Sequence, residues 1–146
     1  MSLTIADGVK QLQTAGAKIT SQRIAIMKAL EGRSDHPSAE QLYYELKPLC
    51  PKLSIATVYN TVQLLAQASL VRTLSIDDRK INFDPSTEPH GHFLCKECRK
   101  IIDIPLPHEK ANGLATHDDI ASVDHTEVFH YGACAECAEK SIHNSA

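Results

Sequence analysis

The amino-acid sequence predicts an α+β protein with an N-terminal winged helix-turn-helix domain and a C-terminal α/β domain. Three observations support this fold class. Apolar residues recur at helical spacing up to Leu70, short strand-like runs follow that residue, and the second half carries two Cys-x-x-Cys pairs. The 146 residues suffice for one domain or for two small ones.

The first half contains signals for helices, which we expect at residues 5–15, 21–31, 39–47 and 55–68. Thr20 and Ser54 are suitable N-caps for the second and fourth helices, because a short hydroxyl side chain can accept a hydrogen bond from the unpaired backbone N–H groups. Ser38, followed three residues later by Gln41, has the pattern of a capping box before the third helix. A glycine or a proline follows each of the first three segments, as is common after a helix ends.

The helix expected at residues 55–68 has two contrasting faces. Its apolar face comprises Ile55, Val58, Val62 and Leu65. The opposite face is polar but uncharged, and comprises Ala56, Tyr59, Asn60, Gln63 and Gln67. Side chains of this kind hydrogen-bond base edges in the major groove. The alternative is an ordinary solvated face, and the face by itself does not decide between the two.

Two short strands are expected after this helix, at residues 71–75 and 80–83, around a turn at residues 76–79. Helices followed by a hairpin give the order of a winged helix-turn-helix, in which the helix before the hairpin enters the major groove. A polar, proline-bearing linker follows at residues 84–89. Beyond it we expect strands at 91–95, 100–104 and 121–131, a helix at 108–117, and a last helical turn after Cys134.

We expect the protein to be cytoplasmic. The first residues lack the basic start and apolar run of a signal peptide, and no apolar stretch reaches the roughly 18 residues of a membrane span. Residues 1–83 carry a net charge of +3 and residues 84–146 a net charge of −6, while seven of the eight histidines lie in the second part. The first part therefore suits a polyanion and the second suits cations.

Four of the five cysteines form the pairs Cys95/Cys98 and Cys134/Cys137. In a reducing compartment such pairs are more often metal ligands than disulfides. Two pairs supply the four thiolates of a closed, tetrahedral structural Zn²⁺ site. A redox role is the alternative, but the sequence has two copies of the pair and no βαβ pattern. The fifth cysteine, Cys50, receives no role.

His90 and His92 alternate on an expected strand, so both should face the same side. A site with four thiolates has no place for them, and nitrogen and oxygen ligands select harder cations than sulfur does. Asp84 lies just before the pair and Asp103 ends the next expected strand. Spacing alone does not single out His36, which lies far away in the first half.

Several motifs together make the sequence similar to the ferric uptake regulator family of metal-dependent repressors. They are "ITSQR" at 19–23, "HPSAEQLY" at 36–43, "SIATVYNTV" at 54–62, "FD" at 83–84, "HGHFLCKEC" at 90–98, "IID" at 101–103 and "YGACAEC" at 131–137. The resemblance covers nearly the whole chain. It implies a DNA-binding domain at residues 1–83, a hinge at 84–90 and a dimerisation and metal-binding domain at 91–146.

Within the family the sequence most resembles the peroxide-responsive branch. By motif, the regulatory Fe²⁺ or Mn²⁺ site of that branch maps to His36, Asp84, His90, His92 and Asp103. The iron- and zinc-sensing branches often have glutamate at one of the aspartate positions and an "HHDH" string where this chain has residues 89–92. His125 matches a histidine of their additional metal site, but Pro89 and Gly91 replace other ligands, so its role stays open.

The resemblance implies a homodimeric, metal-dependent transcriptional repressor, not an enzyme, which releases a palindromic operator DNA when peroxide oxidises a ligand histidine, His36 or His90. The expected DNA contacts are Thr57, Tyr59 and Asn60 to bases, and Lys18 and Arg23 to the backbone or the minor groove. One alternative is the same fold acting as a reversible iron, manganese or zinc sensor. Two others are a metallo-enzyme, which would need no ligand from a DNA-binding half, and a purely structural zinc module.

Overall fold

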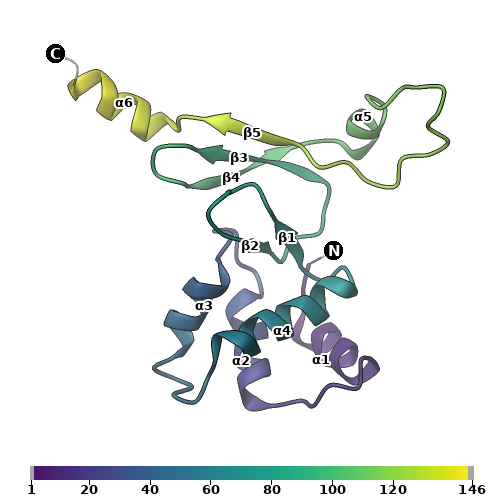
Figure 1. Cartoon of the computed structure of the whole chain (residues 1–146), viewed down its shortest axis with the longest axis vertical. Helices are drawn as coiled ribbons and strands as arrows, with labels where there is room; N and C mark the ends of the chain where they lie inside the picture. The colour runs from purple at the N-terminus through teal and green to yellow at the C-terminus, as the bar shows by residue number, and fades with distance from the viewer. Residues whose placement is uncertain (1, 145–146) are drawn as a thin grey trace. The chain divides into compact units, whose positions relative to one another are not determined.

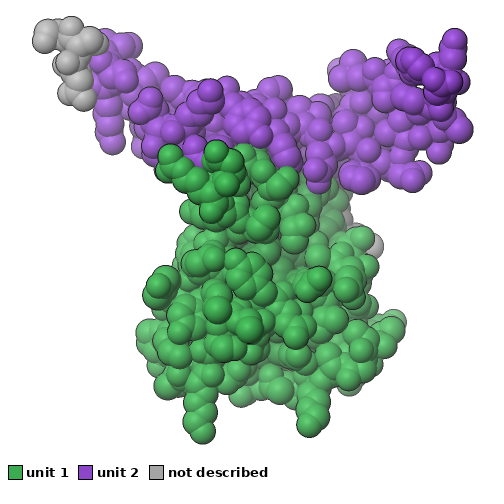
Figure 2. Space-filling model, in the orientation of Figure 1, with its two compact units in different colours: residues 1–88 green, residues 89–146 purple. Residues whose placement is uncertain are grey.

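The computed structural model describes residues 2–144 and divides the chain into two compact units, Met1–Glu88 and Pro89–Ala146 (Figure 2). Asp84 ends one strand and His90 begins another, so the segment between the strands of the two units is residues 85–89. The hinge expected at residues 84–90 includes this segment and one residue on each side, and its role as a hinge stays a prediction. No helix among the described residues is long and apolar enough to cross a membrane.

Within residues 2–88, four α-helices precede a β-hairpin (Figure 1). The helices are α1 (Ile5–Thr14), α2 (Ser21–Leu30), α3 (Ala39–Leu46) and α4 (Ile55–Gln67). Each begins where the sequence predicts and ends one residue earlier. In all four, a serine or threonine at the N-cap accepts a hydrogen bond from the backbone N–H three residues later.

The capping box expected at the start of α3 is formed on one side. The Ser38 hydroxyl accepts from the Gln41 backbone N–H at 3.1 Å, as predicted. The Gln41 side-chain amide instead donates to Glu45 at 3.2 Å and to Asp35 at 3.4 Å. Two carboxylates within reach are better acceptors for an amide N–H than neutral groups are.

The core of this unit lies where the four helices meet. Its fully buried members include Leu12, Ile26, Met27, Leu30, Leu42, Val58, Val62 and Leu65. Three of the four apolar positions expected on α4 are therefore buried. The fourth, Ile55, stands in the first turn and is 37% exposed. The residues expected on the opposite face, Ala56, Tyr59, Asn60, Gln63 and Gln67, are all exposed.

The hairpin consists of β1 (Arg72–Leu74) and β2 (Asn82–Asp84), which pair antiparallel with Thr73 opposite Phe83. Both strands are shorter than expected, because residues 75–81 form the loop between them. Helices followed by this hairpin confirm the predicted winged helix-turn-helix order.

Within residues 89–144, three strands form one sheet in the order β4-β3-β5. Strands β3 (His90–Cys95) and β4 (Ile101–Pro105) are antiparallel, whereas β5 (Phe129–Gly132) runs parallel to β3. The helices are α5 (His108–Asn112) and α6 (Ala135–Asn144). The α+β class is thereby confirmed.

Three of the expectations for this second unit were wrong in length. The helix expected at residues 108–117 ends at Asn112, just before Gly113. The strand expected at 121–131 begins only at Phe129, because β5 pairs with no more than the four residues of β3 from His92 to Cys95. The single turn expected after Cys134 is a helix of ten residues.

Candidate metal centres and nucleic-acid interface

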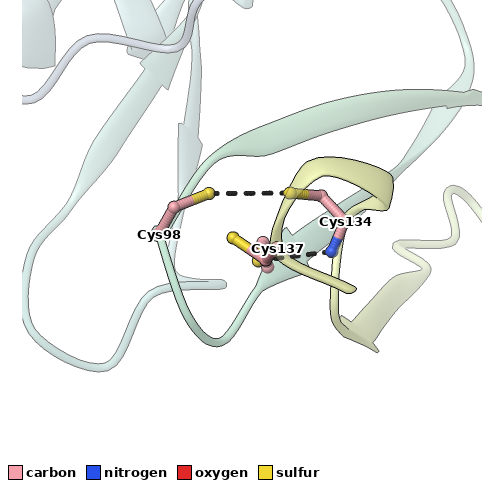
Figure 3. A group of neighbouring side chains, drawn as sticks. Cys98, Cys134 and Cys137 are labelled. Atoms are coloured by element: carbon pink, nitrogen blue, oxygen red, sulfur yellow. Dashed lines mark hydrogen bonds between the residues drawn. The ribbon is translucent and has the colours of Figure 1, made fainter. Parts of the chain in front are cut away.

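The four paired cysteines lie together in the second unit, and Figure 3 labels three of them, Cys98, Cys134 and Cys137. Cys95 ends β3, Cys98 lies in the turn before β4, Cys134 precedes α6, and Cys137 lies in its first turn. Strand pairing brings the two Cys-x-x-Cys pairs together, because Cys95 is the register partner of Gly132, two residues before Cys134. No disulfide joins these four cysteines.

The spacing of the sulfur atoms suits a tetrahedral ion. All four Sγ atoms lie within 4.8 Å of one another, and those of Cys98 and Cys134 are 3.8 Å apart. With metal–sulfur bonds of about 2.3 Å, a tetrahedral zinc ion requires sulfur atoms about 3.8 Å apart. The four sulfur donors and their separations therefore suit a zinc ion. Four thiolates would complete its tetrahedral coordination without a further ligand.

The thiols are electrostatically unequal. Backbone N–H groups of Cys98 and Cys134 point at the Cys95 sulfur, the second at 3.3 Å, and lower the pKa of Cys95 to about 6. The side chain of Cys134 raises the pKa of Cys137 to about 12. Amide donors favour the thiolate, while crowding of four sulfurs disfavours additional negative charges. A divalent cation would remove that conflict, since all its ligands can then be thiolates.

The N-terminal unit contains a pair of potential ligands, His36 and Asp84. The His36 Nε2 atom lies 3.5 Å from an Asp84 carboxylate oxygen, and both side chains are 1% exposed. His36 belongs to the loop between α2 and α3, and its backbone has the left-handed φ of 54°. The Phe83 N–H donates to the Pro37 carbonyl at 2.8 Å, which ties this loop to β2 beside Asp84.

Within the C-terminal unit, His90, His92 and Asp103 form a separate cluster. The two histidines share one face of β3, as their alternation predicts, and His92 is the register partner of Asp103 on β4. One carboxylate oxygen of Asp103 lies 3.3 Å from Nε2 of His90 and 3.5 Å from Nε2 of His92. The His92 side chain is buried and the Asp103 side chain is 41% exposed. Three nitrogen and oxygen donors thus converge without any sulfur.

The residues expected to contact DNA differ in accessibility. Lys18 is exposed, whereas Arg23 is half-buried and donates from its guanidinium to the Lys18 carbonyl at 2.8 Å. Thr57 is half-buried, and its hydroxyl bonds the Ser54 hydroxyl at 2.9 Å. Asn60 is exposed on α4. Lys18 and Asn60 are therefore the more available of this group.

Tyr59 has a partner that the sequence did not indicate. Its hydroxyl donates to the Glu40 carboxylate at 2.8 Å, and this bond raises the pKa of Tyr59 above its ordinary value. Glu40 lies on α3, 19 positions away, so no local spacing could reveal the pair. A groove beside Tyr59 runs between α4 and the hairpin and is lined by Gln63, Gln67, Thr73 and Ile81 among others. The exposed face of α4 therefore borders a groove whose other side is formed by Thr73, Ile81 and Phe83.

Two remaining residues lie outside these groups. Cys50 is half-buried and packs against the helical core. His125 is exposed, and within the described part of the chain it joins no group of three or more potential metal ligands.

The sequence of this chain is similar to those of known proteins. A model of the ferric uptake regulator family matches residues 14–131. The peroxide-responsive repressor PerR of Staphylococcus epidermidis is 35% identical over 137 residues, which are 93% of this chain and 91% of that protein.

Solved structures also match. The structure of PerR from Streptococcus pyogenes superposes with a TM-score of 0.52 at 28% identity, covering 94% of this chain and 95% of that chain. The ferric uptake regulator of Helicobacter pylori superposes with a TM-score of 0.78 at 20% identity, covering 94% and 97% respectively, and so shares the fold.

Proposed function

This chain belongs to the ferric uptake regulator family, and on that premise we propose that it is a metal-dependent transcriptional repressor that senses hydrogen peroxide. The family and the relatives it matches are regulators, so the chain is not an enzyme. The observation that carries the proposal is the separation of two ligand chemistries. Four thiolates gather in one group, while imidazoles and carboxylates gather elsewhere.

The thiolate group would hold a structural Zn²⁺ ion. Cys95, Cys98, Cys134 and Cys137 leave no coordination position open, so this ion would have no catalytic or sensory role. It would join β3 to the start of α6 and thereby stabilise the C-terminal unit, because binding energy at a site absent from the unfolded chain contributes to folding.

The sensory site would combine five residues, His36, Asp84, His90, His92 and Asp103, around Fe²⁺ or Mn²⁺. Three imidazoles and two carboxylates without thiolate suit these ions chemically, and the availability of each ion would decide which one is bound. A site with ligands from both units has higher affinity for one arrangement of the units than for others. Metal binding would therefore shift the population toward the arrangement that binds DNA.

Peroxide sensing would be irreversible damage to a ligand. Bound Fe²⁺ would catalyse cleavage of the O–O bond of hydrogen peroxide, and the ligand imidazole would supply the two electrons. His36 or His90 would receive one oxygen atom, and the other would leave as water. An oxidised imidazole is a poorer ligand, so the site would lose its metal and the repressor would lose its DNA.

DNA recognition would use α4. A homodimer would place two copies of this helix on successive half-sites of a palindromic operator. Tyr59 and Asn60 are exposed on the face that would enter the major groove, and Thr57 is half-buried in the first turn of the same helix. Lys18 and Arg23 would contact the backbone or the minor groove.

The test compares two metals on one DNA. An operator is first selected from a random duplex library with the Mn²⁺-loaded chain. The Fe²⁺-loaded chain should lose this operator after a modest dose of peroxide, and mass spectrometry should find one added oxygen on a peptide that contains His36 or His90. The Mn²⁺-loaded chain should keep the DNA, because Mn²⁺ reduces peroxide poorly.

Two substitutions sharpen the test. His36→Ala should abolish metal-dependent DNA binding and retain zinc, whereas His117→Ala, which removes a histidine that is 65% exposed, should change neither. Asp103→Glu keeps the carboxylate but lengthens its arm, so it should bind DNA with metal and respond less to peroxide. If the Fe²⁺ form keeps its DNA and no histidine is oxidised, a reversible metal-level sensor becomes the better assignment.

A further inference from the structure

The backbone of His36 has an unfavourable left-handed conformation, which contacts with neighbouring residues must stabilise. Among the described non-glycine residues, only His36, Ser69 and Arg99 have positive φ, and His36 alone of these is fully buried. The left-handed region is costly for residues with a Cβ atom, and a residue stays there only when its surroundings fix it. Glycine would relieve the cost here, but it would also remove the imidazole.

The surroundings that fix His36 come from β2. The side-chain amide of Asn82 donates to the His36 carbonyl at 2.8 Å, and both residues are buried. Asn82 also forms a bridge with Ser38, and the Phe83 N–H bonds the Pro37 carbonyl. The Ser38 bridge and the Phe83 bond involve backbone atoms only, so residues of other types could form them. The Asn82 amide is therefore the contact by which the amino-acid sequence fixes the His36 backbone.

The position of Asn82 links this contact to ligand geometry. Asn82 and Asp84 are two residues apart on one strand, so their side chains leave β2 on the same side. Asn82 holds the backbone of His36, and Asp84 meets its imidazole at 3.5 Å. One strand thus fixes both the chain and the side chain of the same histidine.

The stability of the fold alone does not explain an asparagine at position 82. Its side chain is 4% exposed, and its oxygen Oδ1 has no hydrogen-bonding partner within the described part of the chain. A buried acceptor without a partner destabilises the folded state, and an apolar side chain of similar size would avoid that cost. An asparagine at position 82 is explained if the sensory site requires its side-chain N–H as a donor to the His36 carbonyl.

We propose that Asn82 is a positioning residue of the sensory site, which holds His36 in its left-handed conformation so that the imidazole is ready for metal. The proposal rests on the proposed function. It assigns Asn82 no contact with the metal. Loss of its amide should leave the ligands present but poorly arranged, and metal affinity should fall.

The test uses the full-length, zinc-containing chain and Mn²⁺ as the probe. Asn82→Leu keeps the approximate volume and removes the donor. Loss of a group that orients a metal ligand typically costs about 10- to 100-fold in affinity, so we expect Mn²⁺ binding, measured by competition with a metallochromic chelator, to weaken at least tenfold. The thermal midpoint before Mn²⁺ is added should stay within a few degrees of wild type.

Thr61→Val is the matched control. Thr61 is also a buried polar residue of this unit whose hydroxyl has no partner within the described residues, and its substitution should leave Mn²⁺ affinity unchanged. If Asn82→Leu does not fold, Asn82→Ser takes its place, since its shorter side chain withdraws the donor from His36. The proposal is overturned if the folded variant binds Mn²⁺ within twofold of wild type, or if Thr61→Val loses affinity equally.

His36→Ala separates this inference from the proposed function. If His36→Ala binds Mn²⁺ as tightly as wild type, the sensory site itself is wrong. If His36→Ala loses Mn²⁺ and the Asn82 variant does not, the site stands and the role of Asn82 falls.

Discussion

The loop that carries His36 is tied to α3 by one arginine, and removing its charge gives a measurable prediction. The Arg33 guanidinium donates to both oxygens of Asp35 at 2.7 and 2.8 Å and to both oxygens of Glu45 at 2.6 and 3.1 Å. Its side chain is 19% exposed, while those of Asp35 and Glu45 are 55% and 43% exposed. Arg33→Met removes these bonds and keeps the apolar stem in place.

The magnitude follows from geometry and exposure. An exposed ion pair contributes about 0.2–1 kcal/mol to the free energy of unfolding, because water and salt screen the charges. Both pairs here are bidentate and share a mostly buried cation, which places each in the upper part of that range. We therefore expect Arg33→Met to lower the free energy of unfolding at pH 7 by about 1–2 kcal/mol.

The pH dependence has a definite sign. Hydrogen bonds from Arg33 lower the pKa of Asp35 and of Glu45 below their ordinary values near 3.8 and 4.5. The stability they provide is present above those ordinary values and is lost as the pH falls through the lowered ones. The difference between wild type and Arg33→Met should therefore be constant from neutral pH down to about 5 and shrink as the pH falls further, through the lowered pKa values of the two carboxyls.

Urea unfolding followed by far-ultraviolet circular dichroism measures this difference for the helical unit. Lys28→Met is the control, because it removes an exposed positive charge from the last turn of α2, where a cation contributes about 0.3–1 kcal/mol. In 1 M NaCl the effect of Arg33→Met should shrink. A loss no larger than that of the control, or one that persists unchanged at pH 3, would refute the reasoning.

Other substitutions have separate expected outcomes. Cys95→Ser should release zinc and unfold or monomerise the C-terminal unit; a soluble, dimeric chain that elemental analysis finds free of zinc would contradict the zinc assignment. Lys18→Ala should weaken binding to all DNA sequences and lower the slope of log K against log salt by about one. Tyr59→Ala should weaken operator binding by about 1–3 kcal/mol and relax base preference in a selection experiment, and normal binding would show that α4 does not read the groove. Thr61→Val should raise the free energy of unfolding by about 1 kcal/mol in urea titrations, because the buried hydroxyl lacks a partner; an unchanged or lower value would indicate an undetected bond.

The sequence predicted the helical unit well because its signals are local. Thr20, Ser38 and Ser54 mark helix starts through their own hydrogen bonds to the next turn, which form in the structure as expected. The apolar spacing of α4 likewise depends on neighbours within the same helix. The two Cys-x-x-Cys pairs lie together in the structure, as their spacing suggested, and their role as zinc ligands stays a prediction.

The sequence predicted less where contacts are long-range. The extent of β5 depends on how many residues of β3 it can pair with, and no pattern within residues 121–131 encodes that number. His36 and Asp84 meet only because the loop before α3 is tied to β2, so spacing could not select His36 and the resemblance to a family did. The hydrogen bond between Tyr59 and Glu40 could not be predicted for the same reason, since it joins two different helices.

The parallel pairing of β3 with β5 sets the order of events when the chain is made. Parallel strands cannot be joined by a tight turn, and here residues 96–128 separate the end of one strand from the start of the other. Helices form from neighbouring residues, whereas such distant pairing must wait for the second strand. Because domains fold from the N-terminus as they are synthesised, the helical unit would be complete before the sheet closes. A nascent chain would thus hold a finished helical unit before its second Cys-x-x-Cys pair, Cys134 and Cys137, is available to complete the C-terminal unit.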